Sequence, residues 1–209
     1  MEIELVKGKQ KTKHVMPTNW DNISLDQYVR MIKKTKEVGL RELEKVVDII
    51  NILTNIDSAD LYRLSTKNIA QLGGYVTQLL NDLPNEELKH VITIDGIDYG
   101  FHPQLSEMTM GEWVDIDTYI SEGLEDNLHK IMSVLYRPIL EKVDEKYCIE
   151  EYRPCKERQE LFREKMNVGD FYAVSVFFSL LGRELLQSSL KYSITALKEE
   201  KMPTHSDKI

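Results

Sequence analysis

One stretch of this chain occurs twice, about 85 positions apart, and it dictates how each half begins. Each copy has a proline, then a large apolar residue, then a hydroxyl residue followed three positions later by Gln or Glu. Proline ends a strand because it lacks an amide donor, and the hydroxyl with the later Gln or Glu forms a helix capping box. Because a repeat fixes the architecture before any local assignment, we expect two related units. The matched pairs are Pro17 and Pro103, Trp20 and Leu105, Ser24 and Thr109, Gln27 and Glu112, and Tyr28 and Trp113.

Each proline follows a stretch that is typical of a β-hairpin. In the second half, apolar residues on both sides of Asp95 and Gly96 predict two strands joined by a type I′ turn, because these two residues accept positive backbone angles. In the first half, residues 3–6 and 11–16 predict strands on either side of a turn that contains Gly8. A lone hairpin is marginal in water, so the hairpins either pair with each other or pack on helices, and both arrangements stay open.

Apolar residues at three-to-four spacing predict helices after each capping box. In the first half these helices are expected from Leu25, from about Leu40 to Leu53, and from about Thr66 to Asp82. In the second half they are expected from Met110, from Leu124 to Leu135, from Lys156 to Lys165 and from about Val168, with a pattern that extends to Lys198. The expected fold class is α+β, predominantly α-helical, with about three helices after each hairpin. The units would span residues 1–86 and 87–209, and the second would carry an insertion at about 139–166 and a long C-terminal helix.

Composition narrows the classes of function. The formal net charge of −8, from 27 basic and 35 acidic residues, argues against general nucleic-acid binding. The longest apolar stretch, residues 171–186, is interrupted by Arg183 and Glu184, so we expect no membrane span. The N-terminus lacks the pattern of a secretory signal, which favours synthesis and retention in the cytoplasm. Cys148 and Cys155 are too few for a disulfide scaffold, and we expect both to be reduced.

The sequence contains no recognisable catalytic pattern. The five histidines are scattered and lack the spacing of a helical zinc pair. Asp115 and Asp117 could be paired carboxylates, but residues two apart on a helix point in different directions, so a structural role is favoured. We therefore expect no enzyme activity, no cofactor, and no catalytic, cofactor-binding or metal-binding residues.

Two groups of residues are candidate contacts with a partner. Alternating lysines form a basic tip on the first hairpin, although solvated lysines that discourage strand aggregation are the favoured interpretation. The last helix has aromatic residues on more than one face, so it is either central to the fold or covered by a neighbouring subunit. Trp20, Trp113 and Tyr28 are instead interpreted mainly as core residues that pack next to helix caps. The candidate contacts are Lys7, Lys9, Lys11, Lys13, Phe171, Tyr172, Phe177 and Phe178.

Several segments together resemble small structural proteins of tailed bacteriophages, including those of crAss-like phages. The resemblance spans roughly residues 13 to 185. The segments that carry it are residues 17–28, the hairpin at residues 94–96, residues 108–115 and residues 129–138. This resemblance implies a virion component or a morphogenesis protein without catalysis.

The version that we favour is a ring-forming protein of the portal, head-to-tail connector or tail barrel. It would be made in the host cytoplasm and reside in the tail or neck of the virion, where its partners are copies of itself and other portal or tail proteins. The apolar surface of the last helix and the chain termini would form the subunit contacts, because ring closure uses heterologous interfaces. Contact with DNA is less favoured. The alternatives are a tail assembly chaperone that is absent from the virion and, third, a small cytoplasmic enzyme.

Overall fold

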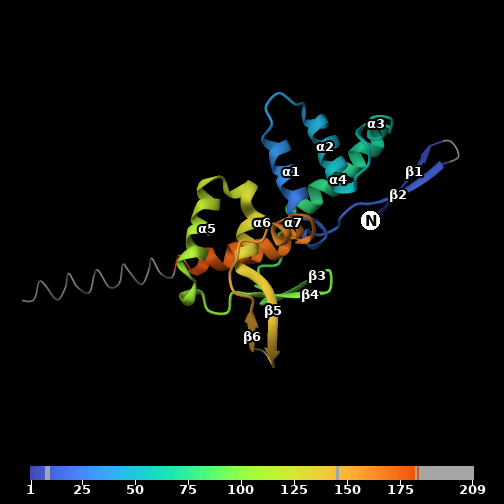
Figure 1. Cartoon of the computed structure of the whole chain (residues 1–209). Coiled ribbons are helices and arrows are strands. Elements are labelled where there is room, and N and C mark those ends of the chain that lie inside the picture. The colour runs from blue at the N-terminus through green and yellow to red at the C-terminus, as the bar shows by residue number, and fades with distance from the viewer. Residues whose placement is uncertain (8–9, 145, 182, 184–209) are drawn as a thin grey trace, which may run out of the picture.

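The computed structural model describes residues 1–7, 10–144, 146–181 and 183, and it confirms an α+β fold that is predominantly helical (Figure 1). The first half contains β1 (Glu2–Lys7), β2 (Gln10–Val15), the 3₁₀ turn η1 (Trp20–Asn22), α1 (Leu25–Lys36), α2 (Glu42–Thr54), α3 (Ser58–Leu61) and α4 (Thr66–Asn81). The second half contains β3 (Val91–Ile94), β4 (Ile97–Phe101), the 3₁₀ turn η2 (Leu105–Glu107), α5 (Met110–Ser121), α6 (Leu124–Leu135), β5 (Tyr136–Val143), β6 (Lys146–Ile149) and α7 (Lys156–Lys165). A last helix, called here the C-terminal helix, begins at residue 168 and is described at residues 168–181 and 183.

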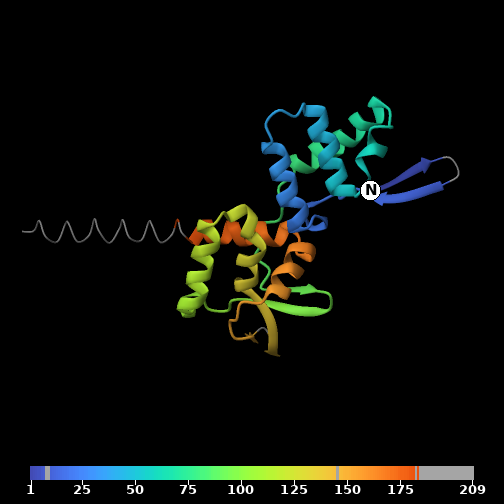
Figure 2. The ribbon, with the colours of Figure 1, turned by 45° about the horizontal axis from the view of Figure 1, so that its top comes forward.

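Most buried hydrophobic residues of the first half form one cluster around α2 and α4. Ile50, Ile56 and Leu61 are fully buried at its centre. The antiparallel β1–β2 hairpin stands out from the helices in both Figure 1 and Figure 2, and it is held by Leu5 and by a contact of 3.2 Å between Nδ1 of His14 and the backbone oxygen of Thr54. The hairpin therefore packs on helices along one face only.

The second cluster lies between an antiparallel sheet, in the order β3-β4-β5-β6, and the helices α6, α7 and the C-terminal helix. Tyr136 and Phe162 are fully buried there, and the Phe101 ring stacks edge-on against Tyr136 at 5.3 Å. In the described residues the two predicted hairpins do not pair with each other, because β4 pairs with β5 instead. Tyr147 of β6 packs so closely over Gly100 that a Cβ there would lie 2.4 Å from its ring.

Backbone contacts join the two clusters at the start of α1. The Val168 amide donates to the carbonyl of Ile23 at 2.9 Å, and the Leu25 amide donates to that of Met166 at 3.0 Å. Between them, Ser24 forms an isolated antiparallel bridge with Asn167. α1 has Met31 in the first cluster and Leu25 in the second, while the C-terminal helix has Val168 in the first and Val174 in the second.

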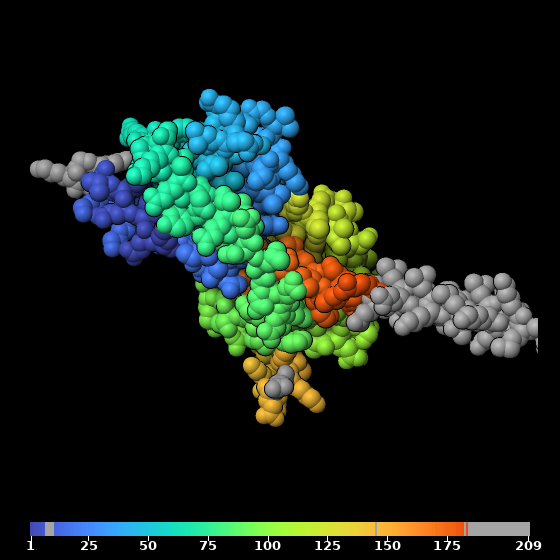
Figure 3. Space-filling model, turned by 180° about the vertical axis from the view of Figure 1, so that it is seen from behind, coloured from blue at the N-terminus to red at the C-terminus, as the bar shows by residue number. Residues whose placement is uncertain are grey.

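The chain after α4 also connects the halves. It lies against the C-terminal helix on the face shown in Figure 3. There Lys89 forms an ion pair of 2.7 Å with the buried carboxylate of Asp170, and the Lys89 backbone oxygen accepts from the Tyr136 hydroxyl at 2.6 Å. Burial, more than any nearby charge, raises the pKa of Tyr136.

The local repeat appears as the same order of elements in both halves: hairpin, 3₁₀ turn, helix, helix. Both capping boxes form as predicted, with Ser24 and Gln27 in α1 and Thr109 and Glu112 in α5. Asp95 and Gly96 have φ values of 49° and 81°, which fits the predicted type I′ turn. The predicted extension of the last helix to Lys198 lies outside the described residues.

Candidate functional site

The helix α5 presents apolar side chains to solvent. Its one buried residue is Glu112. Residues three, four and seven apart share a face of a helix, so these side chains form one band, which we call the α5 stripe. The prediction that Trp113 belongs to the core is wrong, because 54% of this residue is exposed. The α5 stripe consists of Met110, Trp113, Val114 and Ile120.

An apolar groove continues from the α5 stripe toward the C-terminal helix. Trp113 of α5 and Leu181 of the C-terminal helix both line it, and its volume is about 600 Å³. Figures 1 and 2 both show the described end of the C-terminal helix beside α5. The residues that line the apolar groove are Leu88, His90, Phe101, His102, Pro103, Leu105, Ser106, Met108, Trp113, Phe177, Phe178 and Leu181.

A buried charge cluster anchors α5 beneath this surface. Glu112 is 1% exposed, and its Oε2 atom accepts hydrogen bonds from the Thr109 amide at 2.6 Å and the Thr109 hydroxyl at 2.7 Å. Its Oε1 atom lies 2.7 Å from Nη2 of the buried Arg137, at the start of β5. One carboxylate therefore caps α5 and ties it to the sheet.

His102 completes this cluster on the wall of the apolar groove. Its Nε2 atom lies 3.5 Å from Oε1 of Glu112, while its Nδ1 atom accepts from the Gln104 amide at 3.3 Å. This arrangement fits the neutral tautomer with a proton on Nε2. Burial lowers the pKa of His102, and this effect outweighs the opposing charge of Glu112. Because Glu112 is already held by Arg137 and Thr109, the cluster acts as an anchor for α5.

The structure separates the two carboxylates that were considered for catalysis. Asp115 accepts a short hydrogen bond from the Tyr152 hydroxyl, and Asp117 is exposed. Burial, and then this hydrogen bond, raises the pKa of Tyr152. Asp115 thus fixes the chain after β6 against α5.

The four aromatic candidates on the C-terminal helix have different surroundings. The Phe177 and Phe178 rings lie 5.8 Å and 6.4 Å from that of Phe101, so they pack on the second cluster while lining the apolar groove. The Phe171 ring lies 6.4 Å from Tyr28, at the junction of the clusters. Tyr172 is half-buried on another face, beside Leu180 and Arg183.

The lysines of the first hairpin are partly neutralised. Lys11 pairs with Glu4 at 2.8 Å, and Lys13 lies 3.6 Å from Glu2 across the hairpin. Lys7 ends β1, and Lys9 lies outside the described residues. A basic tip that contacts a partner stays a prediction.

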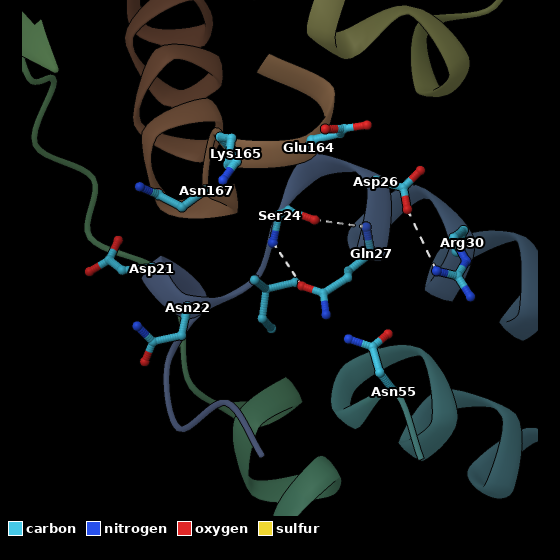
Figure 4. Close-up of a pocket in the computed structure, with 11 residues that line it drawn as sticks. Asp21, Asn22, Ser24, Asp26, Gln27, Arg30, Asn55, Glu164, Lys165 and Asn167 are labelled. Carbon is cyan, nitrogen blue, oxygen red and sulfur yellow. Dashed lines mark hydrogen bonds and ion pairs between the residues drawn. The ribbon is translucent and has the colours of Figure 1, made fainter. Parts of the chain in front are cut away.

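A polar pocket of about 450 Å³ lies where α1, α7 and the end of α2 meet (Figure 4). Most of its polar groups already bind each other or neighbouring residues. Ser24 and Gln27 form the capping box, and Asp26 pairs with Arg30 at 3.6 Å and with Arg163 at 2.6 Å. The pocket is accordingly a hydrogen-bonded joint between helices. It is lined by Asp21, Asn22, Ile23, Ser24, Asp26, Gln27, Arg30, Asn55, Glu164, Lys165 and Asn167.

Three further observations concern the described residues. They contain no group of three or more His, Cys, Asp or Glu side chains placed to hold a metal ion, and no helix among them is long and apolar enough to cross a membrane. Cys148 and Cys155 are both free. No protein family, curated protein or solved structure gives a match to this chain.

The α5 stripe is the part of the surface that the sequence did not reveal. The repeat aligned Trp113 with Tyr28, which is half-buried, and this alignment suggested an equally covered position. A signal was nevertheless present, because Met110, Val114 and Ile120 give α5 more apolar residues than one buried face requires.

Proposed function

We propose that this protein is a non-enzymatic structural component of a tailed-phage virion, and that it assembles into a ring at the portal, head-to-tail connector or tail barrel. The phage origin is supported by the resemblance of residues 17–28, 94–96, 108–115 and 129–138 to such proteins. The assembly role is supported by the surface of α5.

The observation that carries the assembly role is the α5 stripe together with the apolar groove. Exposed apolar side chains gathered on one helix face beside an apolar groove cost free energy in water and mark a contact with another protein. A large exposed aromatic residue such as Trp113 is the side chain most often found at the energetic centre of an interface. Anchoring by Glu112 and Arg137 holds this surface in one conformation before a partner arrives, which lowers the entropic cost of binding.

Two measurements on the full chain test the proposal. Native mass spectrometry of the purified protein is expected to show oligomers, and mass spectrometry of purified phage particles is expected to find the protein in a fixed copy number. In the variant Trp113→Lys, the oligomers are expected to dissociate, because a lysine cannot be desolvated in an apolar contact. A matched control is Tyr62→Lys, which places the same charge at an exposed aromatic residue of the first half.

The outcomes distinguish the alternatives. Protein found in lysates of infected cells but absent from intact particles would exclude a virion component and favour an assembly chaperone. Oligomers that persist in Trp113→Lys, or that are lost equally in Tyr62→Lys, would show that α5 is not the contact surface.

A further inference from the structure

We infer that the apolar groove is occupied by residues 185–198 of a neighbouring copy of this chain. The inference rests on the proposed ring and names the element that would make its subunit contact. It is carried by the position of the groove, the sequence of the segment that follows it, and the charges on the two sides.

The position of the groove links it to the C-terminus. Leu181, on the last described turn of the C-terminal helix, lines the groove, and the chain continues from there through residues 184–209. Phe177 and Phe178 of the same helix also line the groove. A segment of the same copy would have to reverse direction directly after residue 183 to enter it, yet residues 184–202 contain neither Gly nor Pro. A neighbouring copy meets no such constraint.

The segment has the sequence of a helix with one apolar side. Four of its five large aliphatic residues recur at intervals of three and four, which places these four on one face of a helix. A helix that lays such a face into a hydrophobic groove is a recurring mode of peptide recognition. The residues of this face are Leu186, Leu190, Ile194 and Leu197.

The charges favour the same pairing. The stretch from Leu105 to Glu122, which includes the α5 stripe, has acidic residues and neither Lys nor Arg. Residues 185–198 have Lys191 and Lys198 and no acidic residue. Glu107 is exposed before α5, and Asp117 is exposed on the face of α5 that carries the stripe, four residues after Trp113, so the lysines of the segment would meet opposite charges at the contact.

The arrangement also has the geometry of a ring. Each copy would offer a groove to one neighbour and its C-terminal segment to the other, so the two surfaces of the contact differ. Such heterologous contacts repeat from copy to copy and close when the rotation between copies allows it. A single element at one end of the chain would thus link every subunit to the next.

Mixing two full-length variants tests this inference. Trp113→Lys damages the groove and leaves the segment intact, whereas the double variant Leu190→Lys and Ile194→Lys damages the segment and leaves the groove intact. Each alone is expected to be monomeric, while an equimolar mixture is expected to give a heterodimer that grows no further, because one intact contact remains. The control is Ser188→Lys with Thr195→Lys, which places the same charges on the opposite side of the segment and is expected to assemble normally.

A second measurement is independent of ring formation. A fluorescent peptide of residues 184–201 is titrated with the monomeric segment variant, whose groove is intact, and fluorescence anisotropy is recorded. We expect saturable binding that Trp113→Lys in the same background weakens by roughly 30-fold or more, as for an interface hot spot.

Each contrary result is informative. If the segment variant assembles like the wild type, or if the mixture of variants stays monomeric, the groove has a different occupant, while the proposed ring stands. If the wild type is monomeric at every concentration but the peptide binds, the segment fills the groove of its own copy, and both the ring proposal and the inference fail. If the peptide does not bind, the inference is overturned whatever the oligomeric state.

Discussion

The buried carboxylate of Glu112 makes several structural contacts at once. It closes the capping box of α5, pairs with the buried Arg137 and faces His102. An anchor of this kind is costly to break, because the partner charge is then left buried without compensation. The position of α5, and with it the α5 stripe, therefore depends on one side chain.

We expect Glu112→Gln to lower the free energy of unfolding by about 3 kcal/mol, because Arg137 stays buried and loses its counter-charge. Urea denaturation followed by circular dichroism measures the change. The control is Asp117→Asn, which removes an acidic charge from an exposed position of the same helix and should change stability by less than about 0.5 kcal/mol. A Glu112→Gln protein as stable as wild type would contradict the anchoring role.

Two buried histidines predict a stability that falls in mild acid. Burial lowers the pKa of His102 and that of His129 below the ordinary value of 6.5. The unfolded chain consequently binds protons first as the pH falls below 6.5, so each histidine removes at most about 1.4 kcal/mol of stability per pH unit until its folded form also titrates. Denaturation between pH 7.5 and 5.5 should show this loss. The decline should be shallower in His129→Gln, and an unchanged slope would refute the contribution of His129.

At the scale of elements, the repeated capping boxes begin α1 and α5, and they differ in one respect. Ser24 accepts from the Gln27 amide at 3.2 Å, whereas Thr109 both accepts from the Glu112 amide and donates to the Glu112 carboxylate. Removal of a capping hydroxyl costs typically about 1 kcal/mol. The second cap additionally supports the buried anchor.

We therefore expect Thr109→Ala to destabilise the protein more than Ser24→Ala, and Ser24→Ala by about 1 kcal/mol. Thermal denaturation of the variants gives the ranking. Ser106→Ala, at an exposed position just before α5, is the control and should be close to neutral. Equal losses for Ser24→Ala and Ser106→Ala would mean that the first capping box adds nothing to stability.

The sequence predicted those elements whose signals are local. Capping boxes, the Asp95 and Gly96 turn and the charged helix α7 each depend on neighbouring residues, and each formed where predicted. The four-stranded sheet was missed because β5 is non-local: it follows α6 without a break, contains Pro138 and pairs with β4 from Tyr99 to Phe101. Periodicity likewise showed that α5 has an apolar side, but whether the fold covers that side depends on distant elements.

At the scale of the whole molecule, the two hydrophobic clusters share two helices. α1 and the C-terminal helix each contribute to both clusters, and backbone hydrogen bonds at Ile23 and Leu25 join them. If one cluster unfolded, the other would lose packing contacts from α1 and the C-terminal helix.

We accordingly expect a single cooperative unfolding transition. Trp20 reports on the first cluster and Trp113 on the apolar groove, so Trp113→Phe and Trp20→Phe each leave one local probe. In both variants the urea midpoint from tryptophan fluorescence should coincide with the midpoint from circular dichroism. A Trp20 signal that changes before the helix signal would show that the first half unfolds on its own.

The joint at the start of α1 also determines how late in synthesis the first half can finish folding. Asp26 and Arg163, which pair across this joint, lie 137 positions apart. At translation speeds of about 5 to 20 residues per second, the ribosome needs roughly 7 to 27 s to add that much chain. Throughout this interval the backbone groups of Ile23 and Leu25 in the nascent first half lack their hydrogen-bond partners, the backbone groups of Val168 and Met166. The first half can therefore finish folding only after most of the protein has been synthesised.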